Sequence, residues 1–207
     1  MDLTERHRHD AAMRLVAREL THRSKNLLAV VQAIARKTAS LAPDPESFVR
    51  DFSARLRAIA AAHDLLVAEA WSGAALRDLL VTSLAQTVDP AAPAIHVDGP
   101  DVRLAPDSAQ MLALAFHELT INATRHGALS VPGGRLTVQW KREGEDVRLC
   151  WLEQDGPAVR PPAHVGFGRV MLERLVGAAL GGEVALEFRA DGLACELTVP
   201  HDRLTAA

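Results

Sequence analysis

A regular spacing of apolar residues near the N-terminus restricts the fold of this chain more than any other feature. Residues 4–41 contain no glycine or proline. Apolar residues recur there at seven-residue steps, namely at Met13, Leu20, Leu27, Ile34 and Leu41. Such a stripe predicts one long amphipathic helix whose apolar face packs on another helix.

Turn-forming residues interrupt this pattern at Ala42–Pro45, and a second run with helical apolar spacing begins at Glu46. The two runs predict a helical hairpin at residues 1–72. Its apolar face must be covered, because an isolated pair of helices leaves it in water. Either a second copy of the chain completes a four-helix bundle, or the remainder of the chain covers the hairpin.

The pattern changes after Gly73, where short segments with alternating polarity replace the long helical runs. Six of these segments predict strands, near residues 95–97, 102–104, 135–141, 147–153, 183–189 and 193–199. Three longer runs predict helices, near residues 76–86, 106–126 and 168–180. We therefore expect an α+β protein, with an α/β sandwich at 73–207 whose antiparallel-dominated sheet carries helices on one face.

Charge and hydropathy exclude several classes of protein. The formal net charge is -3 at pH 7, so no basic surface argues for nucleic acid as a partner. No apolar run approaches the roughly 18–20 residues of a membrane span, and residues 1–9 lack the apolar core of a signal peptide. We expect a cytoplasmic protein. Cys150 and Cys195 lie in apolar, strand-like segments without metal-type spacing, so both are expected to be buried reduced thiols.

A polar patch surrounds His22 within the first predicted helix. Helical residues advance by about 100 degrees, which places His22 away from the apolar stripe and accessible to a second domain. Glu19 and Asn26 share its face. A carboxylate bonded to one imidazole nitrogen leaves the other free for nucleophilic attack, and Glu19 is the candidate. The patch is either a phosphorylation site, with Arg23 and Lys25 holding the incoming phosphate, or the solvated face of a helix.

A second polar stripe follows the predicted helix 106–126. Glu118, Asn122 and Arg125 are spaced at i, i+4 and i+7, beside the apolar face. Carboxylate and carboxamide oxygens suit Mg²⁺, and a guanidinium suits phosphate. The stripe therefore fits Mg-ATP, although an ordinary, partly exposed helix face has the same pattern.

A glycine-containing segment follows downstream. Gly166, Phe167 and Gly168 precede a predicted helix, whose free backbone N–H groups suit phosphate oxygens. A lone Gly-x-Gly is weak support, and a tight loop explains it equally well.

Taken in order, these motifs resemble the HWE family of sensor histidine kinases over nearly the whole chain. The matching segments are Glu19–Asn26, Arg55–Leu66, His117–Asn122, Gly127–Ser130, Trp151–Glu153, Gly156-Pro157 and Gly166–Gly168. The H, W and E of the family name would be His117, Trp151 and Glu153. The resemblance implies a dimerisation and histidine-phosphotransfer hairpin followed by a Bergerat-type ATP-binding domain.

The resemblance also implies roles for individual residues. His22 would be the phosphoacceptor, Asn122 would coordinate Mg²⁺, and Glu118 would act through metal-bound water. Gly166 and Gly168, with Phe167 between them, would line the phosphate side of the pocket.

On the nucleoside side of the pocket, Glu153 falls where related ATPases read the adenine amino group. Trp151 would be a packing residue, and His117 either a packing or a pocket residue. Three positions depart from the family pattern near the nucleotide. Arg125 replaces the usual Lys and keeps its charge, and His126 replaces a common Tyr. Asp155 replaces a usual Gly and adds a second carboxylate that could contact adenine.

The function implied is a two-component kinase that phosphorylates His22 from Mg-ATP and passes the phosphoryl group to an aspartate of a response-regulator receiver domain. A homodimer is favoured, with a monomer as the alternative. A separate sensor protein would supply the input, unless the sequence is a fragment of a longer kinase. The rival interpretations are a histidine phosphotransfer protein without kinase activity, a mechanical ATPase, and a regulator that sequesters a receiver domain with a vestigial pocket.

Overall fold

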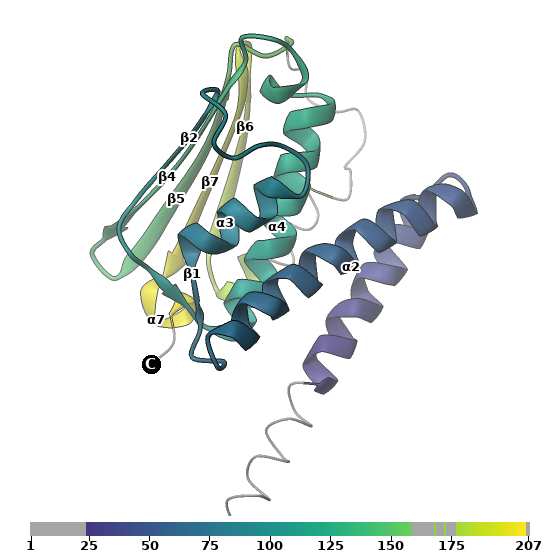
Figure 1. The fold of residues 1–207 in the computed structure, drawn as a ribbon, viewed down its shortest axis with the longest axis vertical. Coiled ribbons are helices and arrows are strands. Elements are labelled where there is room, and N and C mark those ends of the chain that lie inside the picture. Colours follow the sequence, from purple (N-terminus) through teal and green to yellow (C-terminus); the bar gives the residue numbers. More distant parts are fainter. Residues whose placement is uncertain (1–23, 159–167, 169–171, 173–176, 206–207) are drawn as a thin grey trace, which may run out of the picture. The chain divides into compact units, whose positions relative to one another are not determined.

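The structure is a computed structural model that describes residues 24–158, 168, 172 and 177–205 (Figure 1). The chain divides into two compact units, Met1–Ser53 and Ala54–Ala207. Helix α2, Pro45–Ala68, runs through the boundary between them. The domain boundary expected at residues 72 and 73 stays a prediction.

The described part of the first unit consists of helix and turn. Residues 24–41 are helical, and α2 follows after a short turn. The Asp44 carboxylate accepts hydrogen bonds from the backbone N–H of Ser47 at 2.7 Å and from its hydroxyl at 2.8 Å, which begins α2 and lowers the pKa of Asp44. Pro45 suits the first helical position because it has no N–H to satisfy. The predicted helix–turn–helix is confirmed from residue 24 onward, and its earlier part lies outside the described residues.

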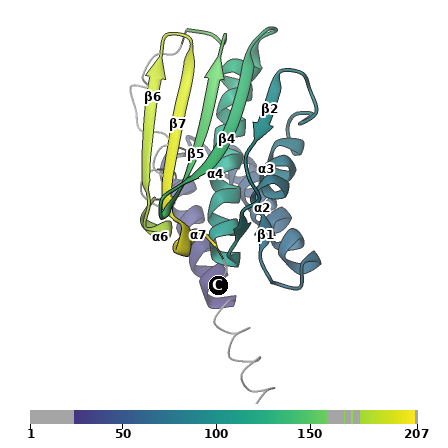
Figure 2. The same ribbon diagram turned by 90° about the vertical axis from the view of Figure 1, so that its left-hand side faces the viewer.

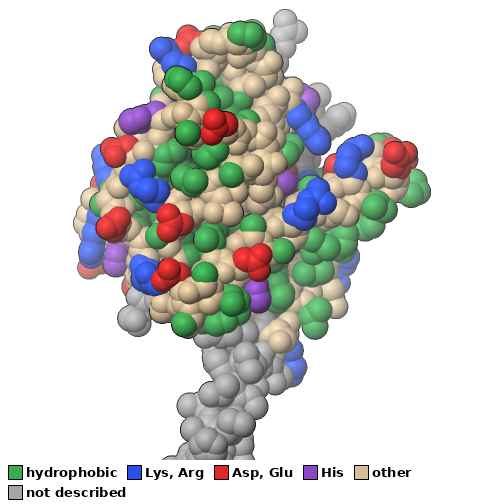
Figure 3. Space-filling view, viewed as in Figure 1, with side chains coloured by type: hydrophobic (Ala, Val, Ile, Leu, Met, Phe, Trp, Pro, Cys, Tyr) green, Lys and Arg blue, Asp and Glu red, His purple; other side chains and the backbone are tan. Residues whose placement is uncertain are grey.

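Several large apolar side chains are exposed in this unit. Leu28 is 60% exposed and Val49 59% exposed, and Leu41 is also exposed. Phe48 and Phe52 stack on each other, with ring centroids 5.4 Å apart. Figure 3 shows apolar side chains along the surface of this helical segment. An apolar surface of this kind is typical of an interface.

A five-stranded sheet forms one layer of the second unit, with strand order β2-β4-β5-β7-β6 (Figure 2). The strands are β2 Ile95–Asp98, β4 Arg135–Glu143, β5 Asp146–Gln154, β6 Glu183–Arg189 and β7 Gly192–Pro200. Only the β2–β4 pair is parallel among the described strands of this sheet. A small antiparallel pair joins β1 Ala74–Ala75 to β3 Arg103–Leu104.

Helices α3, Leu76–Ala85, and α4, Pro106–Arg125, cover one face of this sheet (Figure 2). Alternate residues of β5 point toward that face and are buried, as the period of two requires. Three short elements complete the described part: η1 Ala128–Ser130, α6 Gly177–Leu180 and α7 His201–Leu204. The predicted α+β class, with its antiparallel-dominated sheet and helices on one face, is confirmed. Of the predicted helix 168–180, only Gly168, Leu172 and 177–180 are described.

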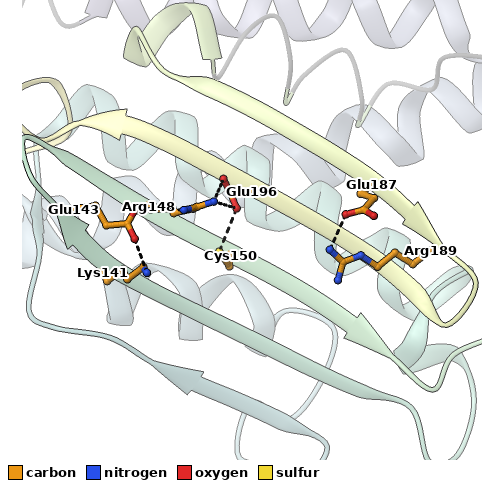
Figure 4. A network of polar contacts seen from close by, with 7 residues as sticks. All are labelled: Lys141, Glu143, Arg148, Cys150, Glu187, Arg189 and Glu196. Carbon is orange, nitrogen blue, oxygen red and sulfur yellow. Dashed lines mark hydrogen bonds and ion pairs between the residues drawn. The ribbon is translucent and has the colours of Figure 1, made fainter.

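The other face of the sheet carries charged side chains. Arg148 pairs with Glu196 at 2.7 Å, and Lys141 pairs with Glu143 (Figure 4). Cys150 lies on this face beside Glu196 and is half-buried, so the prediction that both cysteines are buried is wrong for Cys150. Cys150 alternates with the buried residues of β5, so it lies on the face of the sheet without helices. Cys195 is buried as predicted, and burial raises the pKa of its thiol to about 12.

Among the described residues, no helix combines the length and apolar character that crossing a membrane requires.

Candidate functional site

The predicted polar stripe lies on helix α4, and its residues become more exposed toward the C-terminal end of the helix. Pro106 occupies its first turn, and apolar residues at helical spacing bury one side of it. Glu118 is buried at 6% exposure, Asn122 is half-buried, and Arg125 is exposed in the last turn. The stripe therefore runs from the interior to the surface, with the guanidinium at its outer end.

A buried arginine of α2 engages Glu118. Arg55 Nε donates to Glu118 Oε1 at 2.8 Å, and Arg55 Nη2 donates to Glu118 Oε2 at 3.3 Å. The two side chains are only 9% and 8% exposed. Charge-assisted bonds between a planar guanidinium and a carboxylate fix the orientation of both groups. Glu118 thus has a defined direction before any ligand binds.

Gly168 lies against the same two residues of α4. A Cβ added to Gly168 would stand 3.1 Å from Asn122 Nδ2 and 3.5 Å from Glu118 Oε2. The structure therefore brings together three residues predicted for the phosphate and metal side of the pocket, from segments about 50 residues apart. The missing side chain leaves the backbone of Gly168 close to the carboxamide and the carboxylate.

Glu153 occupies a second buried position, at the end of β5. Its Oε2 accepts from the backbone N–H of Ala128 at 2.9 Å, and its Oε1 accepts from the indole Nε1 of Trp151 at 3.1 Å. Burial raises the pKa of Glu153, and these two hydrogen bonds offset part of that rise. Trp151 is fully buried in the core, and its contact with Glu153 fixes the carboxylate from the same strand face.

Gly127 makes this arrangement possible. A Cβ at Gly127 would stand 1.9 Å from Glu153 Oε2, which is far inside contact distance. The loop after α4 can therefore approach the end of β5 only because residue 127 has no side chain.

Asp155, the other carboxylate predicted near adenine, follows β5 directly. It has φ 57, in the left-handed region where a Gly is favoured, and its side chain is about half exposed. It forms an ion pair with Arg135 at 2.5 Å. The positive φ explains physically why a Gly would suit this position.

The remaining predicted residues divide into two groups. His117 is described and is buried on α4 at 6% exposure. His22, Glu19, Gly166 and Phe167 lie outside the described residues.

These donors fit a magnesium–nucleotide complex. Mg²⁺ in nucleotide sites usually takes one or two protein oxygens, and phosphates and water supply the rest. The described residues contain no group of three or more His, Cys, Asp or Glu side chains that could hold a metal alone. The Asn122 carboxamide and Glu118 carboxylate beside the backbone of Gly168 would instead hold Mg²⁺ jointly with phosphate, where it would neutralise phosphate charge.

Comparison with known proteins supports the resemblance found in the sequence. The family model for HWE histidine kinase matches residues 19–101. In these residues the chain is similar to the HWE histidine kinase family. The matched range includes residues 19–72 of the predicted hairpin, and the sites on α4 and β5 lie beyond it.

Similar proteins extend this likeness over almost the whole length of the chain. A blue-light-activated histidine kinase of Brucella ovis is 39% identical over 203 residues, which are 96% of this chain and 42% of that protein. One of Brucella anthropi is 36% identical over 204 residues, 97% of this chain and 42% of that protein. The chain therefore spans less than half the length of these curated relatives.

Solved structures show the same fold. The blue-light activated histidine kinase of Erythrobacter litoralis EL346 has a TM-score of 0.65 at 17% identity, over 86% of this chain and 60% of that chain. Its isolated histidine kinase domain has a TM-score of 0.60 at 16% identity, over 84% of this chain and 95% of that chain. At these identities the likeness concerns the fold.

Three contacts of the site were not predicted from the sequence: Arg55–Glu118, Trp151–Glu153 and Ala128–Glu153. The first two have a signal in the sequence. Arg55 falls on the buried stripe of α2 with Ala58, Ile59 and Ala62. A charged residue on an apolar stripe signals a buried partner. Trp151 and Glu153 are two apart on one strand, which places them on the same face and signals their contact.

Proposed function

We propose that this chain is a protein-histidine kinase of the HWE family that phosphorylates His22 from Mg-ATP. The observation that carries the proposal is the cluster of Glu118, Asn122 and Gly168, in a chain that matches the HWE family model over residues 19–101. The Glu118 carboxylate and the Asn122 carboxamide, two groups suited to Mg²⁺, lie there beside a glycine whose backbone can approach phosphate closely.

In the proposed reaction, the free ring nitrogen of His22 attacks the γ-phosphorus of ATP. A nitrogen–phosphorus bond forms, and the bond from that phosphorus to the oxygen bridging to the β-phosphate breaks. The leaving ADP takes the bond's electron pair, while the proton on the other ring nitrogen stays hydrogen-bonded to Glu19. Glu118 and Asn122 would position the reacting groups and would form no covalent bond to them. This suffices because phosphoryl transfer depends mainly on the alignment of the reacting groups and on stabilisation of charge.

The phosphohistidine would then transfer its phosphoryl group to an aspartate of a response-regulator receiver domain. The proposal makes Arg125, at the exposed end of the stripe, a phosphate contact at the rim of the pocket. Gly166 and Phe167 would continue the phosphate side next to Gly168. Glu153 or Asp155 would read the adenine amino group. His117 remains a candidate pocket residue.

A receiver-binding protein with a vestigial pocket is the second candidate, and one observation favours it. Both buried carboxylates already accept hydrogen bonds from protein groups: Glu118 from Arg55, and Glu153 from Ala128 and Trp151. Such a protein would keep the hairpin but would bind no Mg-ATP.

Substitution of Asn122 by Ala separates the two candidates. We expect Asn122→Ala to lower Mg-dependent ATP affinity and to abolish labelling from γ-labelled ATP, with the thermal unfolding midpoint little changed. Asp107→Ala, at an exposed position in the first turn of the same helix, is the matched control and should retain labelling. Labelling that is equal in both variants would mean that the metal role of Asn122 is misassigned, and wild type without Mg-ATP binding would favour the vestigial pocket.

A further inference from the structure

The buried ion pair between α2 and α4 includes Arg55, which is not among the proposed active-site residues. Arg55 belongs to the second helix of the predicted hairpin, yet its guanidinium contacts Glu118, which lies beside Asn122 and Gly168. We propose that Arg55 is a positioning residue of the nucleotide site, which holds the Glu118 carboxylate in its working orientation. This inference rests on the proposed kinase function.

The geometry of the pair favours orientation over simple charge neutralisation. Arg55 uses two nitrogens, Nε at 2.8 Å from Oε1 and Nη2 at 3.3 Å from Oε2. Two roughly parallel bonds fix the plane of the carboxylate, which a single bond would leave free to turn. Lysine presents a point charge on a flexible stem and cannot reproduce this fork.

The place of the pair also argues for a functional role. A buried ion pair is weak support for stability, because well-packed apolar residues of similar volume often stabilise a protein as well or better. Here the pair lies where a Cβ on Gly168 would be 3.5 Å from the Glu118 carboxylate. It therefore orders one of the side chains that the proposed Mg-nucleotide complex would meet.

Arg55 belongs to the second unit, and its helix packs on the core of that unit. Ala62 and Leu66, on the same stripe of α2, belong to the hydrophobic core of that unit. The end of the helix is fixed as well, because Arg103 Nη2 bonds to Glu69 Oε2 at 2.6 Å and to Ser72 Oγ at 2.7 Å. A side chain used for positioning needs such a rigid base. The second helix thus contributes a residue to the nucleotide site.

Variants of Arg55 in the full chain test the inference. The measured quantities are the rate of acid-labile labelling at saturating Mg-ATP and the affinity for Mg-ADP by calorimetry. We expect Arg55→Gln to lower the rate by about 10–100-fold, as loss of an outer-shell partner typically does, with affinity changed by less than about threefold. Arg57→Gln, on the exposed side of the same helix, is the matched control and should label at the wild-type rate.

Two further variants separate positioning from a structural role. Arg55→Lys keeps the charge and removes the fork, so we expect it to fold and still to lose at least about tenfold in rate. The double variant Arg55→Gln with Glu118→Gln should label no more slowly than Glu118→Gln alone, because Arg55 acts through Glu118. The inference would be overturned if the double variant labelled more slowly than Glu118→Gln by the same factor by which Arg55→Gln is slowed relative to wild type. It would also be overturned if Arg55→Lys labelled at the wild-type rate.

The outcomes also distinguish this inference from the proposed function. Wild-type protein without any acid-labile label would overturn the proposed kinase function and this inference with it. Labelled wild type, with Arg55 variants equal to Arg57→Gln, would overturn the inference alone.

Discussion

The carboxylate of Glu153 receives donors from two different elements. The Trp151 indole comes from the same strand, and the Ala128 N–H comes from the loop after α4. Both bonds favour the ionised form, whereas burial opposes it and is the larger effect, so the pKa of Glu153 is raised. The Glu153 side chain therefore connects β5 to the loop after α4. Because this carboxyl group can gain or lose a proton, the connection is sensitive to pH.

Glu153→Gln tests this sensitivity. A carboxyl group whose pKa is higher in the folded state than in the unfolded state stabilises the protein fully below the unfolded value, and this contribution is lost as the pH rises through the folded pKa. The loss begins near the ordinary value of 4.5 and extends upward. We expect the thermal unfolding midpoint of wild type, relative to that of Glu153→Gln, to decrease as the pH is raised above 4.5. Parallel pH profiles of the two proteins would contradict this assignment.

At the scale of elements, the sequence predicted much of the fold. The alternation in β4, β5 and β7 and the apolar spacing of α4 are local patterns, so their elements could be found without a structure. Glu118 and Asn122 could be placed beside each other for the same reason. The Arg55–Glu118 and Ala128–Glu153 contacts join residues 63 and 25 positions apart, and a local period contains no such information.

Gly127→Ala tests the close approach of the loop to β5. Gly127 has an extended backbone with φ -105, so alanine can adopt its conformation, and the effect comes from the contacts with Glu153 Oε2 at 1.9 Å and with the Ala123 Cα at 2.9 Å. We expect a loss of about 1–3 kcal/mol in the free energy of unfolding in urea, typical of overpacking. Val131→Ala, an exposed position in the same loop, is the control and should change it by less than about 0.5 kcal/mol. Equal losses in the two variants would refute the steric explanation.

For the whole molecule, the first unit leaves apolar side chains in solvent. Leu28, Leu41 and Val49 are all exposed there, and such residues are typical of a surface that a second copy covers. The charged open face of the sheet in the second unit has the opposite character, and its exposed ion pairs are suited to water. These two surfaces favour a homodimer formed through the hairpin.

Val49→Glu tests the proposed dimer. A charge buried in an apolar interface is costly, so we expect the dimer dissociation constant to rise at least about tenfold. Light scattering across a concentration series measures it. Val81→Glu, an exposed position on α3, is the matched control and should leave the dimer intact. A wild-type chain that is monomeric at all concentrations would contradict the dimer and favour a hairpin covered within one chain.

Incubation with γ-labelled ATP and Mg²⁺ tests the central claim most directly, because acid-labile, base-stable label indicates a phosphohistidine and the comparison with His22→Ala tests which of the nine histidines carries it. We predict that wild-type protein acquires label that is lost in acid and retained in base, and that His22→Ala acquires none. Label of the same amount and acid lability on His22→Ala, or no label on the wild type, would contradict the assignment of His22 as the phosphoacceptor.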